Sequence, residues 1–173
     1  MTEKIIIAGA GGQGIMLAGK VLAEAAMREN KYVTWLPCYG AEVRGGAAYC
    51  MIIISDAEIS SPYVDKADTL IIMNNPSLEK FKPKLKNRGL LIVNSSLAKK
   101  NKGCGINQPF TDIAVKLGNI KVANMVALGC YLAKRNVINM KNVFQTIEKM
   151  APAEKKGLIA INKLALEEGM KLR

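Results

Sequence analysis

The first fourteen residues constrain the fold of this chain more than any other stretch does. A short β-branched run over residues 4–8 (KIIIA) stops at Gly9, which is the pattern of a strand buried on both faces in a parallel sheet. A glycine-rich turn, GAGGQG, follows at residues 9–14, and from Ile15 to Arg28 apolar residues recur at helical spacing. The sequence therefore predicts a strand, a glycine turn and a helix in succession, the opening unit of an α/β protein.

The rest of the chain repeats this alternation of short apolar strands and helices. We expect a single α/β domain spanning residues 1–173, with three layers, a Rossmann-like, mostly parallel but mixed sheet, and helices on both faces. A short polar piece that ends at residues 60–62 (SSP) would turn back as a hairpin, which would make the sheet mixed. Further strands are expected over residues 32–36, 47–54, 69–73 and 90–93, and further helices over residues 77–85, 111–117, 125–134, 141–150 and 158–168.

Composition excludes several classes of chemistry. The chain has no His, which removes the commonest general base and metal ligand, and with it every Ser-His or Cys-His dyad. The four cysteines, Cys38, Cys50, Cys104 and Cys130, are scattered without a C-x-x-C pair, so neither a zinc site nor an iron–sulfur cluster is predicted on this chain. We therefore expect no catalytic residues and no bound metal.

The charge of the chain favours an anionic ligand or an acidic protein partner. The 25 Lys and Arg residues exceed the 14 Asp and Glu residues, which leaves a net charge of +11. The densest basic run, over residues 80–88, has only Phe81 among its alternating partners, so it lacks the stacking aromatics of a nucleic-acid interface. This run is interpreted as a solvated surface, with a docking patch as the alternative, and no nucleic-acid partner is expected.

Neither a targeting segment nor a membrane span is expected. The N-terminal apolar stretch is broken by glycines before it reaches the length of a signal-peptide core. No run approaches the roughly 18 apolar residues that a membrane span needs. Unpaired cysteines without a secretion signal suit a reducing compartment, so a cytoplasmic location without membrane contact is expected.

The turn Gly9-Ala10-Gly11-Gly12-Gln13-Gly14 fits G-x-G-x-x-G and stands between a predicted strand and a predicted helix. Glycines permit positive φ and close approach of a ligand, and the following helix N-terminus offers unpaired amide donors. The turn is therefore typical of a phosphate or pyrophosphate site. The alternative is that the glycines only permit a tight crossing from strand to helix. NAD is disfavoured, because Thr34, Trp35 and Leu36 stand where a dinucleotide site has an acidic residue.

A second glycine-bearing loop, Tyr39-Gly40-Ala41-Glu42-Val43-Arg44-Gly45-Gly46, follows the second predicted strand. It should lie at the carboxyl edge of the sheet and share one crevice with the first loop. Arg44 offers a planar cationic fork to a phosphate or carboxylate, and the two glycines after it would let backbone donors approach the same anion. Glu42 would orient Arg44 or meet another cationic neighbour. The alternative is that Glu42 and Arg44 form an ordinary surface ion pair.

Four ordered motifs together resemble one family. These are GAGGQG at residues 9–14, YGAEVRGG at residues 39–46, SDAEISSPYVDKADTLIIMNNPSLEKF at residues 55–81, and VANMVALG at residues 122–129. They are similar to the gamma subunit of 2-oxoacid:ferredoxin (acceptor) oxidoreductases of the 2-oxoglutarate, pyruvate or 2-oxoisovalerate type. The resemblance implies an enzyme that converts a 2-oxoacid and coenzyme A to acyl-CoA, carbon dioxide and a reduced acceptor.

The resemblance also implies a division of labour between subunits. Thiamine diphosphate, Mg and iron–sulfur clusters would be held by alpha, beta and ferredoxin-like delta partner subunits, with ferredoxin as the acceptor. This chain would be inactive alone, would help to bind coenzyme A, and would contribute to assembly of the complex. Its implied cofactor-binding residues are Gly9, Gly11, Gly12, Gln13, Gly14, Tyr39, Gly40, Glu42, Arg44, Gly45 and Gly46.

The chain departs from the family pattern at Ala41, where the family usually has proline, so the rigidity of the second loop would differ. Asn124 lies in the last motif and is interpreted either as a family residue or as a helix N-cap, and Asn74 has the same two interpretations. A stand-alone nucleotide-binding or NAD(P)-binding module is the alternative function. A nucleic-acid binder is the weakest of the three hypotheses.

Overall fold

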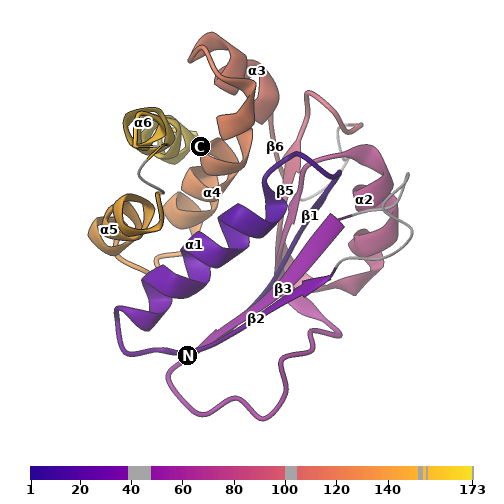
Figure 1. The fold of residues 1–173 in the computed structure, drawn as a ribbon. Helices are drawn as coiled ribbons and strands as arrows, with labels where there is room; N and C mark the ends of the chain where they lie inside the picture. The colour runs from indigo at the N-terminus through magenta and orange to yellow at the C-terminus, as the bar shows by residue number, and fades with distance from the viewer. Residues whose placement is uncertain (39–47, 100–104, 152–153, 155, 173) are drawn as a thin grey trace.

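The computed structural model describes residues 1–38, 48–99, 105–151, 154 and 156–172. These residues form one α/β domain built on a six-stranded sheet with the strand order β2-β3-β1-β4-β5-β6 (Figure 1). The strands are β1 (Thr2–Gly9), β2 (Tyr32–Cys38), β3 (Ala48–Ser55), β4 (Ala67–Ile72), β5 (Leu85–Asn94) and β6 (Ile106–Gln108). The predicted fold class is confirmed, although the three-residue strand β6 was not predicted.

The sheet is mixed because β3 runs against its neighbours. β3 pairs antiparallel with both β1 and β2, whereas β1, β4, β5 and β6 pair in parallel. The prediction that a piece ending at residues 60–62 forms the returning hairpin is wrong, because that segment contains no strand. The connection over residues 39–47 is shorter than the dozen or more residues that a parallel crossover needs, so β3 has to return antiparallel.

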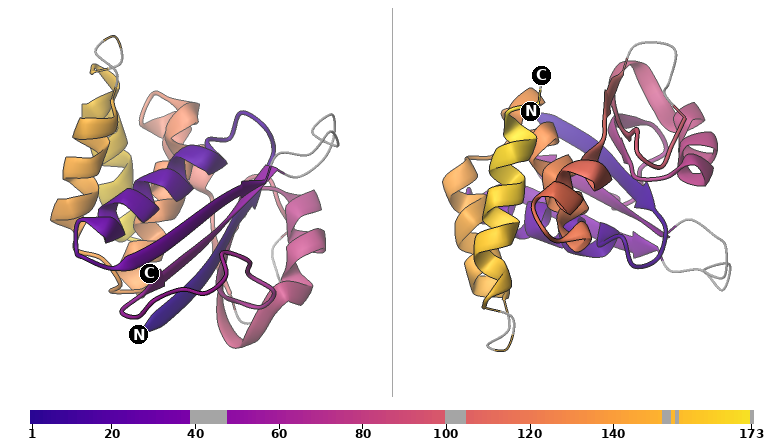
Figure 2. Two further views of the ribbon diagram at one scale, coloured as in Figure 1. Left: turned by 60° about the horizontal axis from the view of Figure 1, so that its bottom comes forward. Right: turned by 90° about the horizontal axis from the view of Figure 1, so that it is seen from above.

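The helices cover the two faces of the sheet unequally (Figure 2). One face of the sheet is covered by α1 (Ile15–Met27), α3 (Phe110–Lys116), α4 (Ala123–Lys134), α5 (Met140–Met150) and α6 (Leu158–Met170). On the other side α2 (Asn75–Phe81) continues into the short 3-10 helix η2 (Lys82–Lys84). Pro83 lies in η2, so the predicted helix over residues 77–85 loses its α-helical form in its last turn.

Two apolar clusters, one on each face of the sheet, make up the core. Along β1, Ile5 and Ile7 face the larger cluster and Ile6 and Ala8 face the smaller one, and all four are at most 2% exposed. This placement explains why residues 4–8 lack the apolar–polar alternation of a strand with one solvated face. The larger cluster contains most of α4, as its apolar sequence suggested.

Two backbones come into direct contact where α4 crosses α6. A Cβ added to Gly129 would lie 2.1 Å from the Leu166 carbonyl oxygen, and one added to Gly169 would lie 2.0 Å from the Val126 carbonyl oxygen. Only glycine permits this approach. The pair therefore fixes α6 against α4 and helps to place the first turn of α4, which faces the glycine turn.

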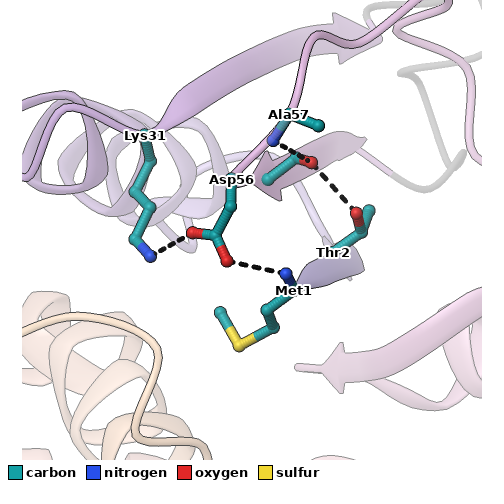
Figure 3. A network of polar contacts seen from close by, with 6 residues as sticks. Met1, Thr2, Lys31, Asp56 and Ala57 are labelled. Atoms are coloured by element: carbon teal, nitrogen blue, oxygen red, sulfur yellow. Dashed lines mark hydrogen bonds and ion pairs between the residues drawn. The ribbon is translucent and has the colours of Figure 1, made fainter.

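The N-terminus is tied to the amino end of the sheet by a polar network (Figure 3). The Asp56 carboxylate accepts hydrogen bonds from the Lys31 ammonium and, at 2.6 Å, from the Met1 amine. These donors, Lys31 foremost, lower the pKa of Asp56 from 3.8 to about 2. The Thr2 and Ser55 hydroxyls are 3.0 Å apart beside this network. None of the helices in the described ranges is long and apolar enough to cross a membrane.

Candidate functional site

The glycine turn over residues 9–14 lies at the carboxyl edge of the parallel strands and leads directly into α1 (Figure 1). Gly12 and Gly14 have φ values of +84° and +71°, so the predicted need for glycine is confirmed at these positions. A Cβ on Gly12 would meet nothing within 4 Å, whereas one on Gly9 would lie 2.5 Å from the Gln13 side-chain oxygen. Glycine at position 9 therefore permits close packing against Gln13, and glycine at position 12 leaves the backbone of the turn accessible to a ligand.

Gln13 holds the turn together from inside. Its Oε1 accepts a hydrogen bond from the Ala10 amide at 2.6 Å, and its Nε2 donates to the Met73 carbonyl at 3.3 Å. The side chain therefore links the turn to the end of β4. Direct contact between Gln13 and a ligand stays a prediction.

Asn94, which was predicted only as part of a strand-end turn, connects three elements at the same edge. It is fully buried at the end of β5. Its Nδ2 donates to the Met73 carbonyl at 3.2 Å and to the Thr111 hydroxyl at 2.8 Å, and its Oδ1 accepts from the Thr111 amide. Asn94 thereby fixes the start of α3 beside the ends of β4 and β5.

Asn74 and Asn124, each interpreted from the sequence as a family residue or a helix N-cap, have different roles in the structure. Asn74 is the N-cap of α2, because its side chain accepts a hydrogen bond from the Ser77 amide at 3.0 Å. The N-cap prediction for Asn124 is wrong: α4 begins at Ala123, and Asn124 lies inside its first turn. The cause is the short helix η3 (Ile120–Val122), which runs directly into α4 and is itself capped by Asn119.

Asn124 instead contacts the glycine turn. Its Nδ2 donates to the Gly14 carbonyl at 3.0 Å, and its Oδ1 accepts from the Met125 amide at 2.9 Å. The side chain is only 3% exposed. The turn is therefore held by Gln13 near its start and by Asn124 at its end.

A cavity of about 220 Å³ opens beside the turn. Among the described residues that line it, Lys121 carries the one charge, and Thr111 supplies a hydroxyl beside the start of α3. The first turn of α1 has no acidic side chain, so no residue of that turn neutralises the partial positive charge of the helix N-terminus. The described residues that line it are Gly12, Gln13, Met73, Leu97, Thr111, Ile120, Lys121 and Ala123.

This arrangement suits an anionic group attached to a less polar body. Backbone amides and Lys121 would contact the anion, while Met73, Leu97 and Ile120 present apolar surface. Sequence reasoning missed Lys121 and Thr111, because both lie about a hundred residues from the glycine turn. The one available signal was the closeness of Lys121 to the motif at residues 122–129.

The second predicted loop lies outside the described residues, so the places of Tyr39, Gly40, Glu42, Arg44, Gly45 and Gly46 stay predictions. The ends of that connection are described. Cys38 pairs with Tyr49, and Ala48 pairs with Gly9, so both ends reach the edge of the sheet where the glycine turn begins. A crevice shared by the two loops is compatible with these anchor points and stays a prediction.

The strand order disfavours the usual way of binding a dinucleotide. β3 lies between β1 and β2, so the end of β2 is two strands away from the glycine turn. At about 4.8 Å per strand, that separation is roughly 10 Å. An acidic residue at the end of β2 would therefore stand one strand too far from a ribose bound at the turn.

The described buried thiols have no nucleophilic character. Burial raises the pKa of the Cys50 thiol to about 12 and that of the Cys130 thiol to about 11. Both thiols stay protonated at neutral pH, and a protonated thiol is neither a nucleophile nor a ready metal ligand.

Comparison with known proteins gives consistent matches along the chain. A sequence model of the family described as pyruvate ferredoxin/flavodoxin oxidoreductase matches residues 4–172. Ketoisovalerate oxidoreductase subunit VorA of Methanothermobacter thermautotrophicus is 35% identical over 168 residues, which cover 96% of this chain but 35% of the relative. The chain thus spans about a third of the length of that relative.

Two other matches have nearly the length of this chain. 2-Oxoglutarate synthase subunit KorC of Methanocaldococcus jannaschii is 34% identical over 172 residues, which cover 94% of this chain and 92% of the relative. The crystal structure of the gamma subunit of a keto/oxoacid ferredoxin oxidoreductase from Geobacter sulfurreducens superposes with a TM-score of 0.84. It is 29% identical, and the match covers 98% of this chain and 96% of that one.

Proposed function

The chain belongs to the pyruvate ferredoxin/flavodoxin oxidoreductase family, and we propose that it is the gamma subunit of a 2-oxoacid:ferredoxin oxidoreductase. The complete enzyme would convert a 2-oxoacid and coenzyme A to acyl-CoA and carbon dioxide, with reduction of ferredoxin or another acceptor. Support comes from VorA, which is named as a subunit of a ketoisovalerate oxidoreductase, and from KorC, which is named as a subunit of 2-oxoglutarate synthase and matches over nearly its whole length. Which 2-oxoacid is used would be set by other subunits.

We propose that this chain contributes part of the coenzyme A site. One observation carries the proposal: Gly12, which has a positive φ, and Lys121 line the same cavity, beside the turn that leads into α1. Coenzyme A carries phosphate groups attached to a less polar body, which is the class of ligand that this lining suits. Arg44 and its neighbouring glycines would add contacts from the second loop.

The size of the cavity supports a site shared with a partner chain. Its volume of about 220 Å³ is below the roughly 300–1,000 Å³ of pockets that enclose a whole drug-sized ligand. It would therefore hold one phosphate-bearing part of coenzyme A, and another chain would cover the remainder. This is the physical reason to expect binding by the complex to be tighter than binding by the isolated chain.

Thiamine diphosphate, its Mg ion and the iron–sulfur clusters are proposed to lie on alpha, beta and delta subunits. The donors that the structure describes on this chain fit none of these groups. Cys50 and Cys130 are buried with raised pKa values, and the described residues contain no group of three acidic or cysteine side chains placed to hold a metal. These groups supply decarboxylation and electron transfer when bound by the partners. The residues of this chain bind and orient coenzyme A.

The test is reconstitution with a charge removed from the cavity. Partner subunits are purified with wild-type chain or with Lys121→Ala, and coenzyme A-dependent oxidation of 2-oxoacids is followed by acceptor reduction. Lys171→Ala is the matched control, because Lys171 is exposed at the end of α6 and pairs with Glu168. We expect no turnover by the isolated chain. In the reconstituted complex we expect a higher KM for coenzyme A with Lys121→Ala and an unchanged KM with Lys171→Ala.

Two results would overturn the proposal. Turnover by the isolated chain would show that catalytic groups lie on it. An unchanged KM for coenzyme A in Lys121→Ala would show that the cavity is not part of the coenzyme A site. Tight binding of NAD(P) by the isolated chain, without binding of coenzyme A, would instead support a stand-alone nucleotide module.

A further inference from the structure

Asn124 joins two segments that are 110 residues apart in the chain. Its Nδ2 donates to the Gly14 carbonyl at 3.0 Å, which connects the first turn of α4 to the last residue of the glycine turn. The same carbonyl accepts from the Ala18 amide at 3.0 Å as α1 begins, so both of its lone pairs have a donor. The Asn124 side chain is almost fully buried and Gly14 is half-buried, so water has limited access to this contact.

Gly14 and Asn124 fit each other sterically. A Cβ on Gly14 would lie 2.4 Å from Asn124 Nδ2, well inside van der Waals contact. The amide group of Asn124 thus occupies the space that a side chain on residue 14 would need. The positive φ of Gly14 and the absence of its side chain together bring the turn up to the start of α4.

The cavity lies beside this contact and is lined by residues that precede Gly14 and Asn124 in the chain. Gly12 and Gln13 line it from the turn, immediately before Gly14. Lys121 and Ala123 line it from the other segment, immediately before Asn124. The Asn124–Gly14 hydrogen bond therefore sets the distance between the wall that carries backbone amides and the wall that carries the ammonium group.

We propose that Asn124 is the positioning residue of this anion site. It acts through Gly14, holding the turn so that its amides and Lys121 face one anionic group. The inference rests on the proposed function, because it takes the cavity to be part of the coenzyme A site. A turn fixed before binding loses less conformational entropy when the ligand arrives, so its rigidity appears as affinity.

The experiment compares two asparagines on the full-length chain. Asn124→Ala removes the contact with Gly14. Asn139→Ala is the matched control: its side chain caps α5 by accepting from the Lys141 amide at 2.9 Å, near the far end of α1. Asn124→Ser is the second variant should Asn124→Ala fail to fold, because its hydroxyl remains close to the Met125 amide but is too short to reach Gly14.

Two readouts are taken for each variant. Hydrogen exchange of peptides covering residues 10–18 reports the opening of the turn. Calorimetric titration with coenzyme A, and with inorganic pyrophosphate as a simpler anion, reports affinity. We expect faster exchange and a fivefold to tenfold weaker affinity, roughly the size of one lost hydrogen bond, in the Asn124 variants and neither change in Asn139→Ala.

The outcomes separate the two proposals. If the wild-type chain binds either probe and the Asn124 variants bind it equally well, Asn124 has no positioning role, while the proposed function stands. Equal losses in Asn124→Ala and Asn139→Ala would reduce the role of Asn124 to general stability and also overturn the inference. If wild type binds neither probe, alone or with partner subunits, the proposed function fails, and the inference fails with it.

Discussion

Two glycines of the same turn give a matched test of how the turn is held. Gly12→Ala and Gly14→Ala both force an alanine into positive φ, at a cost of about 1–2 kcal/mol each. Their surroundings differ, because the new Cβ meets open space at Gly12 and Asn124 Nδ2 at Gly14. The gain from a less flexible unfolded chain is the same for both substitutions and cancels in the comparison.

The difference in unfolding free energy can be worked out from the contact with Asn124. Displacing Asn124 breaks its hydrogen bond to Gly14 and leaves a buried amide without that partner, which costs about 1–3 kcal/mol. Gly14→Ala should therefore destabilise the chain by about 1–3 kcal/mol more than Gly12→Ala does. In an Asn124→Ala background the clash disappears, and Gly14→Ala should then cost about as much as Gly12→Ala.

Urea unfolding measures these differences, with the fluorescence of Trp35, the single tryptophan, as the probe. The reasoning is refuted if the two glycine variants are equally stable. It is also refuted if Gly14→Ala costs the same whether or not Asn124 is present, because the coupling between the two residues would then be absent.

Three further predictions concern acid stability, thiol reactivity and helix packing. Asp56 has a pKa lowered to about 2 by its two ammonium neighbours, so it stabilises the fold above its ordinary pKa of 3.8 and loses that contribution as pH falls toward 2. Thermal unfolding of Asp56→Asn should thus depend less on pH between 4 and 2 than that of wild type, and an unchanged dependence would contradict the assignment. Cys50 and Cys130 should resist iodoacetamide at pH 8 in the folded chain, as read by mass spectrometry, and their modification without unfolding would show that the thiols are accessible. Gly129→Ala should lower the unfolding free energy by about 3 kcal/mol or more, because its new Cβ meets the α6 backbone. Gly157→Ala, whose Cβ meets open space, should change the unfolding free energy little. Similar urea midpoints for the two variants would contradict the close contact between α4 and α6.

Local patterns predicted most elements of the fold. The run over residues 4–8 is a strand buried on both faces, and the apolar segment over residues 125–134 is a buried helix. Gly12 and Gly14 have the positive φ that the turn motif implied. The three-residue strand β6 gave no periodicity to detect, because alternation over so few residues is indistinguishable from a loop.

The candidate site was predicted only in part, because its two walls come from distant segments. The glycine turn was identified from its own residues. Lys121 and Thr111 were not, since nothing in their local sequence distinguishes them from other surface residues. Asn124 was interpreted from its neighbours either as a family residue or as a cap, and neither interpretation identified its hydrogen-bond partner 110 residues away.

The amino-acid sequence by itself determined where strands and helices form, which of their faces are apolar, and where the backbone needs glycine. These properties depend on the dihedral preferences and side-chain periodicity of neighbouring residues. Tertiary structure alone decided that β3 enters between β1 and β2, and that Asn124 and Lys121 meet the glycine turn. The physical reason is that strand order and side-chain contacts between distant segments depend on how all the apolar faces are buried together.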